Sequence, residues 1–152
     1  MKQFWAPKTV CDFLKVHHIE KEFLSRELPL GIYCTENILW AELLVYQKEL
    51  PSLLVFENLS SVANRLQTLR GIVFQGAQII ITSAWRSESY NKKIGGEPMS
   101  KHVLGQALDF FVKNVPPSKV QTLLKSFSGG LGAYKNFTHI DIAAKRRWQG
   151  QD

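Results

Sequence analysis

The sequence has 152 residues, of which 45% are hydrophobic and 21% are charged, and its formal net charge is +6 at pH 7. This length and balance are typical of one globular domain with an apolar core. No run of about 18 apolar residues occurs, which argues against a transmembrane helix, and the N-terminus lacks the apolar stretch of a secretory signal peptide. The positive charge favours an anionic partner, although a solubilising surface explains it equally well.

The first third of the chain carries the least informative pattern. Apolar spacing predicts short helices over residues 10–17 and 19–26, and a longer helix over residues 38–49. No linker, repeat or low-complexity segment is visible in the sequence. We therefore predict a single domain over residues 1–152, with residues 1–50 as a candidate N-terminal elaboration.

The rest of the chain predicts an alternation of helices and strands. Apolar residues recur at three- and four-residue steps in the helical segments, whereas β-branched residues or period-two alternation mark the strands. The expected helices cover residues 60–74, 87–93 and 118–127, and the expected strands cover residues 78–82, 107–112, 131–134 and 137–143.

Two histidines and two carboxylates are spaced so that they can meet in one cleft. His102 and Asp109 are seven positions apart and would face opposite ways on a straight strand. Gly105 permits a bend that puts His102 on a loop and Asp109 on the strand. His139 and Asp141 are two positions apart and share one face of the last strand.

Two neutral imidazoles and one carboxylate suit Zn²⁺ with an open position for water. Zinc lowers the pKa of such a water towards about 7, and a second carboxylate can take its proton. Asp141 is the candidate base, and Arg86 is the candidate for holding an oxyanion or a substrate carboxylate. Tyr134 is a substrate contact or a core aromatic. Each residue also has a purely structural interpretation: the histidines could be hydrogen-bonded beside the core, the aspartate could lie at a strand edge, and Arg86 could be a surface residue.

Three motifs in this order resemble the zinc D-Ala-D-Ala carboxypeptidase family of peptidoglycan peptidases, including its endolysin-like members. The resemblance covers about residues 55–149 and is specific because three separate motifs occur in the family's order. The motifs are the segment 82–91, which contains Ser-Ala-Trp-Arg-Ser; Ser100-x-His102-x-x-Gly105-x-Ala107-x-Asp109; and His139-Ile140-Asp141 followed by Arg147-Trp148.

The resemblance implies an α+β fold of the hedgehog/D,D-peptidase type, in which a small antiparallel sheet carries the zinc site and packs against helices. It implies that the zinc ligands are His102, Asp109 and His139. It further implies that Arg86 stabilises the polarised carbonyl or anchors the substrate. Ser100 is expected to support the ligand loop or to touch the substrate.

The catalytic base is where this sequence departs from many relatives. They carry an acidic residue three positions before the last histidine, whereas this chain has Asn136 there. An amide cannot accept a proton at neutral pH. Other members carry the His-x-Asp pattern found here, so Asp141 is predicted as the base, with the alternative that it only orients a zinc ligand.

We predict a zinc-dependent peptidase that hydrolyses an amide bond in peptidoglycan stem peptides or cross-links, as a D,D-carboxypeptidase or an endopeptidase. We expect a monomer without membrane insertion, made in the cytoplasm and acting on the cell wall after release as a phage lysin, or carried on a virion. One alternative is a non-catalytic, zinc-containing wall-binding module of the same fold. Nucleic-acid binding rests on charge alone, because no recognition helix or RNA-stacking motif is visible.

Overall fold

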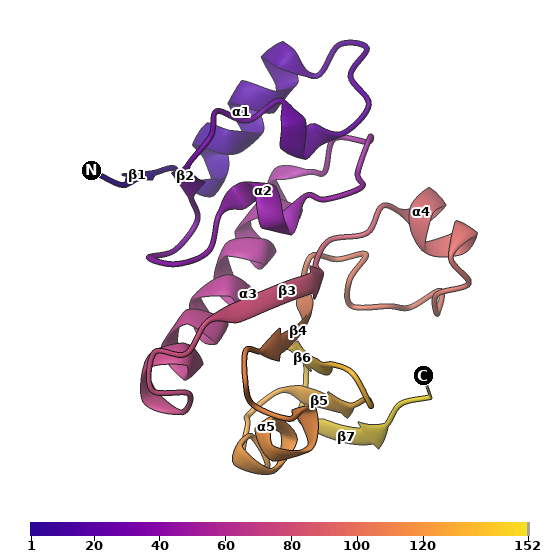
Figure 1. Cartoon of the computed structure of the whole chain (residues 1–152). Helices are drawn as coiled ribbons and strands as arrows, with labels where there is room; N and C mark the ends of the chain where they lie inside the picture. The colour runs from indigo at the N-terminus through magenta and orange to yellow at the C-terminus, as the bar shows by residue number, and fades with distance from the viewer. Residues whose placement is uncertain (152) are drawn as a thin grey trace.

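The computed structural model describes residues 1–151, and its centre is a five-stranded sheet against which helices pack (Figure 1). The strand order is β3-β4-β6-β5-β7. Neighbouring strands are antiparallel except for β5 and β7, which run parallel. The strands are β3 (Ile79–Ser83), β4 (Ala107–Val112), β5 (Gly130–Ala133), β6 (Thr138–Asp141) and β7 (Arg146–Gln149).

In Figure 1, α1 and α2 form the upper part of the molecule, the long α3 runs beside the sheet, and α5 lies at the lower end. A short parallel pair of strands ties the N-terminus to the segment before α2. These elements are α1 (Pro7–His17), α2 (Trp40–Leu43), α3 (Leu53–Ile72), α4 (Glu88–Lys93), α5 (Pro117–Leu123), the 3₁₀ turn η1 (Leu24–Arg26), β1 (Gln3–Phe4) and β2 (Ile32–Tyr33).

The alternation of β4 and β6 divides the sheet into a core face and a polar face. Leu108, Phe110 and Ile140 are fully buried and join residues of α3 and α5 in one apolar core. Because successive side chains of a strand point to opposite faces, Asp109 and His139 lie on the other face, where they are direct cross-strand partners. The predicted strand over residues 107–112 and its two faces are confirmed.

Helix α3 begins one to two turns earlier than the predicted segment 60–74. Ser52 caps its first turn, where the side-chain hydroxyl accepts a hydrogen bond from the backbone N–H of Val55 at 3.3 Å. Phe56 extends the apolar stripe and is fully buried. The same core reaches Val10 of α1, so residues 1–50 pack onto the rest of the chain. The single domain over residues 1–152 remains a prediction that this packing supports.

Two of the predicted N-terminal helices were wrong in extent. The helix expected over residues 38–49 is only α2, and that expected over residues 19–26 is only η1. In each segment a residue adopts the left-handed region, Tyr46 with φ 67° and Glu20 with φ 60°. A right-handed helix cannot continue through such a residue.

The predicted small antiparallel sheet needs a correction, because the sheet is mixed. Strand β7 was missed and pairs in parallel with β5, with Gly130 opposite Arg146 and Gly132 opposite Trp148. The four residues of β7 show no apolar alternation, so only tertiary pairing reveals the strand. Within residues 1–151, no helix has the length and apolar character needed to cross a bilayer.

Replacing Phe56 with alanine is expected to destabilise the protein by about 3–5 kcal/mol, because a fully buried ring that contacts Trp40 leaves a cavity. Urea unfolding followed by circular dichroism measures this change. Leu54→Ala is the matched control on the same helix: Leu54 is 64% exposed, so its effect should stay within about 0.5 kcal/mol. Equal losses in both variants would contradict the packing of α3.

Candidate metal centre

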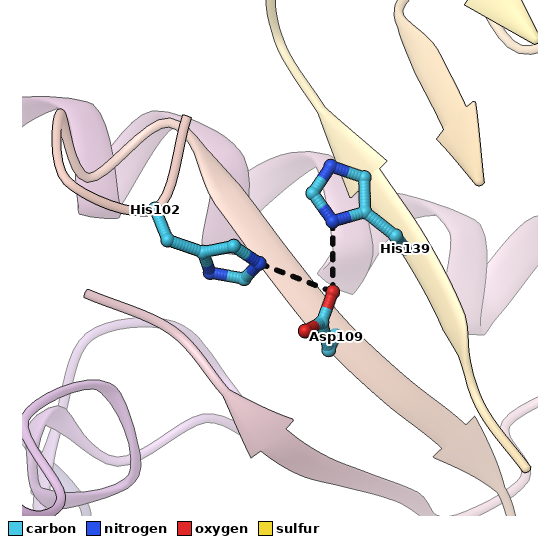
Figure 2. Close-up of side chains that lie close together, drawn as sticks. All are labelled: His102, Asp109 and His139. Atoms are coloured by element: carbon cyan, nitrogen blue, oxygen red, sulfur yellow. Dashed lines mark hydrogen bonds and ion pairs between the residues drawn. The ribbon is translucent and has the colours of Figure 1, made fainter. Parts of the chain in front are cut away.

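The three predicted metal ligands meet on the polar face of the sheet. His102 lies on the loop that leads into β4, Asp109 lies on β4 and His139 lies on β6. All three are buried, and one ligand atom from each lies within 4.8 Å of the others. Figure 2 shows both imidazoles directed at the same carboxylate oxygen of Asp109. Residues 37 positions apart in the sequence are thus brought to one point.

The hydrogen bond made by Nδ1 of His102 determines whether Nε2, which faces Asp109, carries a proton or a lone pair. Nδ1 lies 2.6 Å from the backbone carbonyl oxygen of Ala84, which can only accept, so Nδ1 carries the proton and donates it. In the neutral imidazole Nε2 then carries a lone pair. Nε2 lies 3.1 Å from Oδ1 of Asp109, yet it is buried and makes no hydrogen bond.

His139 is arranged in the same way but with its ring nitrogens exchanged. Nε2 lies 3.0 Å from Oδ2 of Asp141, and Nδ1 lies 2.8 Å from Oδ1 of Asp109. With Nε2 donating to the carboxylate of Asp141, the lone pair of the neutral ring sits on Nδ1 and faces Asp109. The hydrogen bond that His139 donates to Asp141 therefore selects the nitrogen that faces the site.

Three lone pairs consequently converge on a buried point, and such a cluster requires a cation. Burial alone would lower the pKa of His139, but the hydrogen bonds and charges of Asp109 and Asp141 outweigh burial and raise that pKa. Two imidazoles and a carboxylate match a catalytic zinc site with an open position, so the residues present fit zinc.

Asp109 is held ionised and offers one oxygen to the site. Burial alone would raise its pKa, but the two neighbouring imidazoles, His102 at 3.1 Å and His139 at 2.8 Å from Oδ1, outweigh burial and hold the pKa well below its usual range. Its other oxygen, Oδ2, accepts a hydrogen bond from Nη2 of Arg86 at 3.2 Å. Arg86 also donates from Nε to Ser83 at 3.0 Å. The predicted Arg86 thus lies beside the metal ligands.

Asp141 lies outside the ring of ligand atoms and is fully buried. Its carboxylate accepts hydrogen bonds from Arg146 at 2.6 and 3.2 Å and from the backbone N–H of Ala143 at 3.0 Å, in addition to that from His139. Burial alone would raise the pKa of Asp141, but the hydrogen bonds from His139, Arg146 and Ala143 outweigh burial and lower that pKa below its usual range. Both of its oxygens are already engaged with partners other than a water.

The two remaining predicted residues lie at the margin of the site. The hydroxyl of Ser100 accepts a hydrogen bond from the backbone N–H of His102 at 3.3 Å, which supports the ligand loop. The hydroxyl of Tyr134 accepts one from Nε1 of Trp148 at 3.3 Å, and the Trp148 ring packs on that of His139 with centroids 5.1 Å apart. Tyr134 therefore reaches the site only through Trp148.

Sequence reasoning gave no role to Ala84, Arg146 or Trp148. Ala84 contributes through a backbone carbonyl, which no side-chain pattern can reveal. Trp148 belonged to a family motif, but the function of that motif was not apparent from residue type. Arg146 belongs to the basic run 145–147, for which a solubilising surface and an anion-binding patch were both open, whereas its guanidinium pairs with a buried carboxylate.

The sequence matches the model of the Peptidase M15 family over residues 36–141, and the chain therefore belongs to this peptidase family. Two relatives are similar to it. One is the probable peptidoglycan L,D-endopeptidase MepK of Haemophilus influenzae, 34% identical over 101 residues, which are 61% of this chain and 53% of that protein. The other is the peptidoglycan L,D-endopeptidase MepK of Escherichia coli K12, 30% identical over 93 residues, 56% of this chain and 51% of that protein.

The chain spans about half the length of the curated relatives it matches. Peptidases of the M15 family are zinc-dependent, and His102, Asp109 and His139 form a cluster that could hold such an ion. The predicted family and zinc cofactor are confirmed. The non-catalytic module is not favoured, because the chain retains a complete donor set and the similar proteins are endopeptidases.

The purified protein is expected to bind about one zinc ion per chain, and His102→Ala is expected to lose it, because two ligands do not complete a zinc site. Mass spectrometry of metal content measures this. Chelation should lower the melting temperature of the wild type, since binding adds about 4 kcal/mol when free zinc exceeds Kd a thousand-fold. His17→Ala, an exposed histidine of α1, is the control and should keep its zinc. Zinc retained by His102→Ala would contradict the ligand set.

Proposed function

We propose that this chain is a zinc peptidase that hydrolyses an amide bond in the stem peptides or cross-links of peptidoglycan. The observation that carries the proposal is the convergence of His102, Asp109 and His139 on one buried point in a chain of a peptidase family. The substrate class is inferred from the two similar proteins, both named for a peptidoglycan peptide bond.

Zinc at this point would polarise the scissile carbonyl and lower the pKa of a water beside it. The chain itself supplies the groups that hold the substrate. Arg86 is held by hydrogen bonds to Ser83 and Asp109, and its side chain is 17% exposed, so a positive charge lies beside the ligands and is still accessible to solvent. We infer that it binds the developing oxyanion or a substrate carboxylate.

We infer that Asp141 orients His139, which is the second of the two roles predicted for it. A general base must reach the proton it takes, either directly or through one water. The carboxylate of Asp141 is fully buried, and its partners are His139, Arg146 and a backbone N–H. Acting as the base would require it to leave these partners, whereas orienting His139 requires only the contacts it has.

The site of action that we propose is the cell wall, where the chain acts as a monomer without inserting into the membrane. A net charge of +6 favours association with an anionic wall. Release to the wall in the manner of a phage lysin stays a prediction. Because the two similar proteins are named L,D-endopeptidases, a peptide bond between an L- and a D-residue is the first candidate for the bond that is cleaved.

The zinc-loaded protein is expected to release soluble fragments from purified peptidoglycan, and each cleavage should create one new amine and one new carboxylate. Liquid chromatography with mass spectrometry of the fragments identifies the bond. His139→Ala should reduce the rate at least about a hundred-fold, because hydrolysis without the metal loses its electrostatic stabilisation. His17→Ala is the matched control. Intact peptidoglycan after incubation with a protein shown to hold zinc would refute the proposed function.

Asp141→Asn separates the two roles of this residue. If Asp141 orients His139, the variant should bind zinc about 10–100-fold more weakly, and excess zinc should restore much of the activity. A base role predicts the opposite pattern, with unchanged zinc affinity and a loss of activity that zinc does not repair. Chelator competition measures the affinity, and fragment release measures the activity over a zinc titration.

A further inference from the structure

Strand β7 brings two side chains against the outer side of the metal centre. Arg146 makes a two-point contact with Asp141, with Nη2 2.6 Å from Oδ2 and Nη1 3.2 Å from Oδ1. Trp148 packs on the ring of His139 at 5.1 Å, and the Arg146 guanidinium lies over the Trp148 ring at 5.2 Å. The two side chains therefore contact each other as well as the site.

Strand β5 lies between β6 and β7, and its glycines leave room for the side chains of β7 to contact those of β6. Gly130 and Gly132 stand opposite Arg146 and Trp148 in the parallel pairing. A Cβ atom at Gly130 would lie 2.4 Å from Oδ2 of Asp141, and one at Gly132 would lie 2.6 Å from the indole of Trp148. Real Cβ atoms do not approach that closely, so both positions require glycine for the observed arrangement.

We propose that β7 is an orienting clamp for His139, and that Arg146 is a positioning residue of the metal centre. Arg146 fixes the carboxylate of Asp141 so that Oδ2 accepts from Nε2 of His139, while Trp148 fixes the plane of the ring. The lone pair of Nδ1 is then presented to the metal. The inference rests on the metal site of the proposed function and not on its substrate.

The charge and shape of arginine both matter in this clamp. Asp141 is fully buried, and a buried carboxylate is costly unless it is paired and its oxygens are hydrogen-bonded. Arginine offers two parallel N–H donors to one carboxylate, which lysine cannot do. Without Arg146, Asp141 would keep His139 and one backbone N–H as its partners. The carboxylate would then be free to rotate, and the ring nitrogen that faces the site would no longer be fixed.

Arg146→Gln is expected to weaken zinc binding about 10–100-fold, and Arg146→Lys should lie between it and the wild type, because groups that orient a ligand commonly contribute that much. Chelator competition measures Kd. The control is Lys145→Gln, which removes one positive charge from the neighbouring exposed position and should stay within about two-fold of the wild type. This control separates the contact with Asp141 from the general effect of positive charge.

Nitrogen-15 NMR of the histidine rings supplies a second readout that does not depend on activity. In the zinc-loaded wild type, His139 should carry its proton on Nε2, and this signal should weaken or exchange in Arg146→Gln. Gly130→Ala tests the same clamp without changing Arg146, because its Cβ would displace the carboxylate of Asp141. It should produce a similar zinc loss, and it keeps the test decisive if Arg146→Gln does not fold.

Wild-type zinc affinity and an unchanged His139 signal in a folded Arg146→Gln or Gly130→Ala variant would overturn the clamp. Failure of the proposed function looks different. A wild type that binds zinc but leaves peptidoglycan intact would refute the peptidase activity, and the change in Kd caused by Arg146→Gln would still support the clamp. Circular dichroism of each variant confirms that a lost signal does not come from unfolding.

Discussion

The metal centre depends on hydrogen bonds that point away from it. A neutral imidazole has one donor and one acceptor nitrogen, so whichever nitrogen is engaged outside the site decides which lone pair faces inward. The carbonyl of Ala84 sets this choice for His102, and the carboxylate of Asp141 sets it for His139. If either outer partner moved, the two ring nitrogens would no longer both face Oδ1 of Asp109, and the site would bind a cation more weakly.

The side chains that stabilise the fold and those that form the metal site lie on opposite faces of the sheet. Along β4 and β6, alternate side chains enter the apolar core, while the others form the polar face that holds the ligands. The core side chains hold the strands in register, and that register puts Asp109 opposite His139 and Ala107 opposite Asp141. A shift of one residue would exchange the two faces, so the packing of the core also fixes the geometry of the metal site.

The motifs of the sequence predicted the family, the three ligands and the strand that carries Asp109. Gly105 adopts φ 72°, and its bend places His102 on the loop before β4, as the spacing argument required. These features were accessible because each motif is a local pattern of residue types that can be recognised without knowing how the motifs meet in the fold. The extents of α2 and η1 were not accessible, since left-handed residues at Tyr46 and Glu20 give no clear signal in residue type.

The sequence by itself therefore determined the peptidase family and the strand and loop from which the candidate donors come. Only the tertiary structure decided that β7 pairs in parallel with β5, and that Arg146 and Trp148 thereby reach Asp141 and His139. The physical reason is that strand pairing and the partners of buried charges depend on contacts between distant segments. Residue periodicity records which face of a segment is apolar, but it does not record which other segment will cover that face.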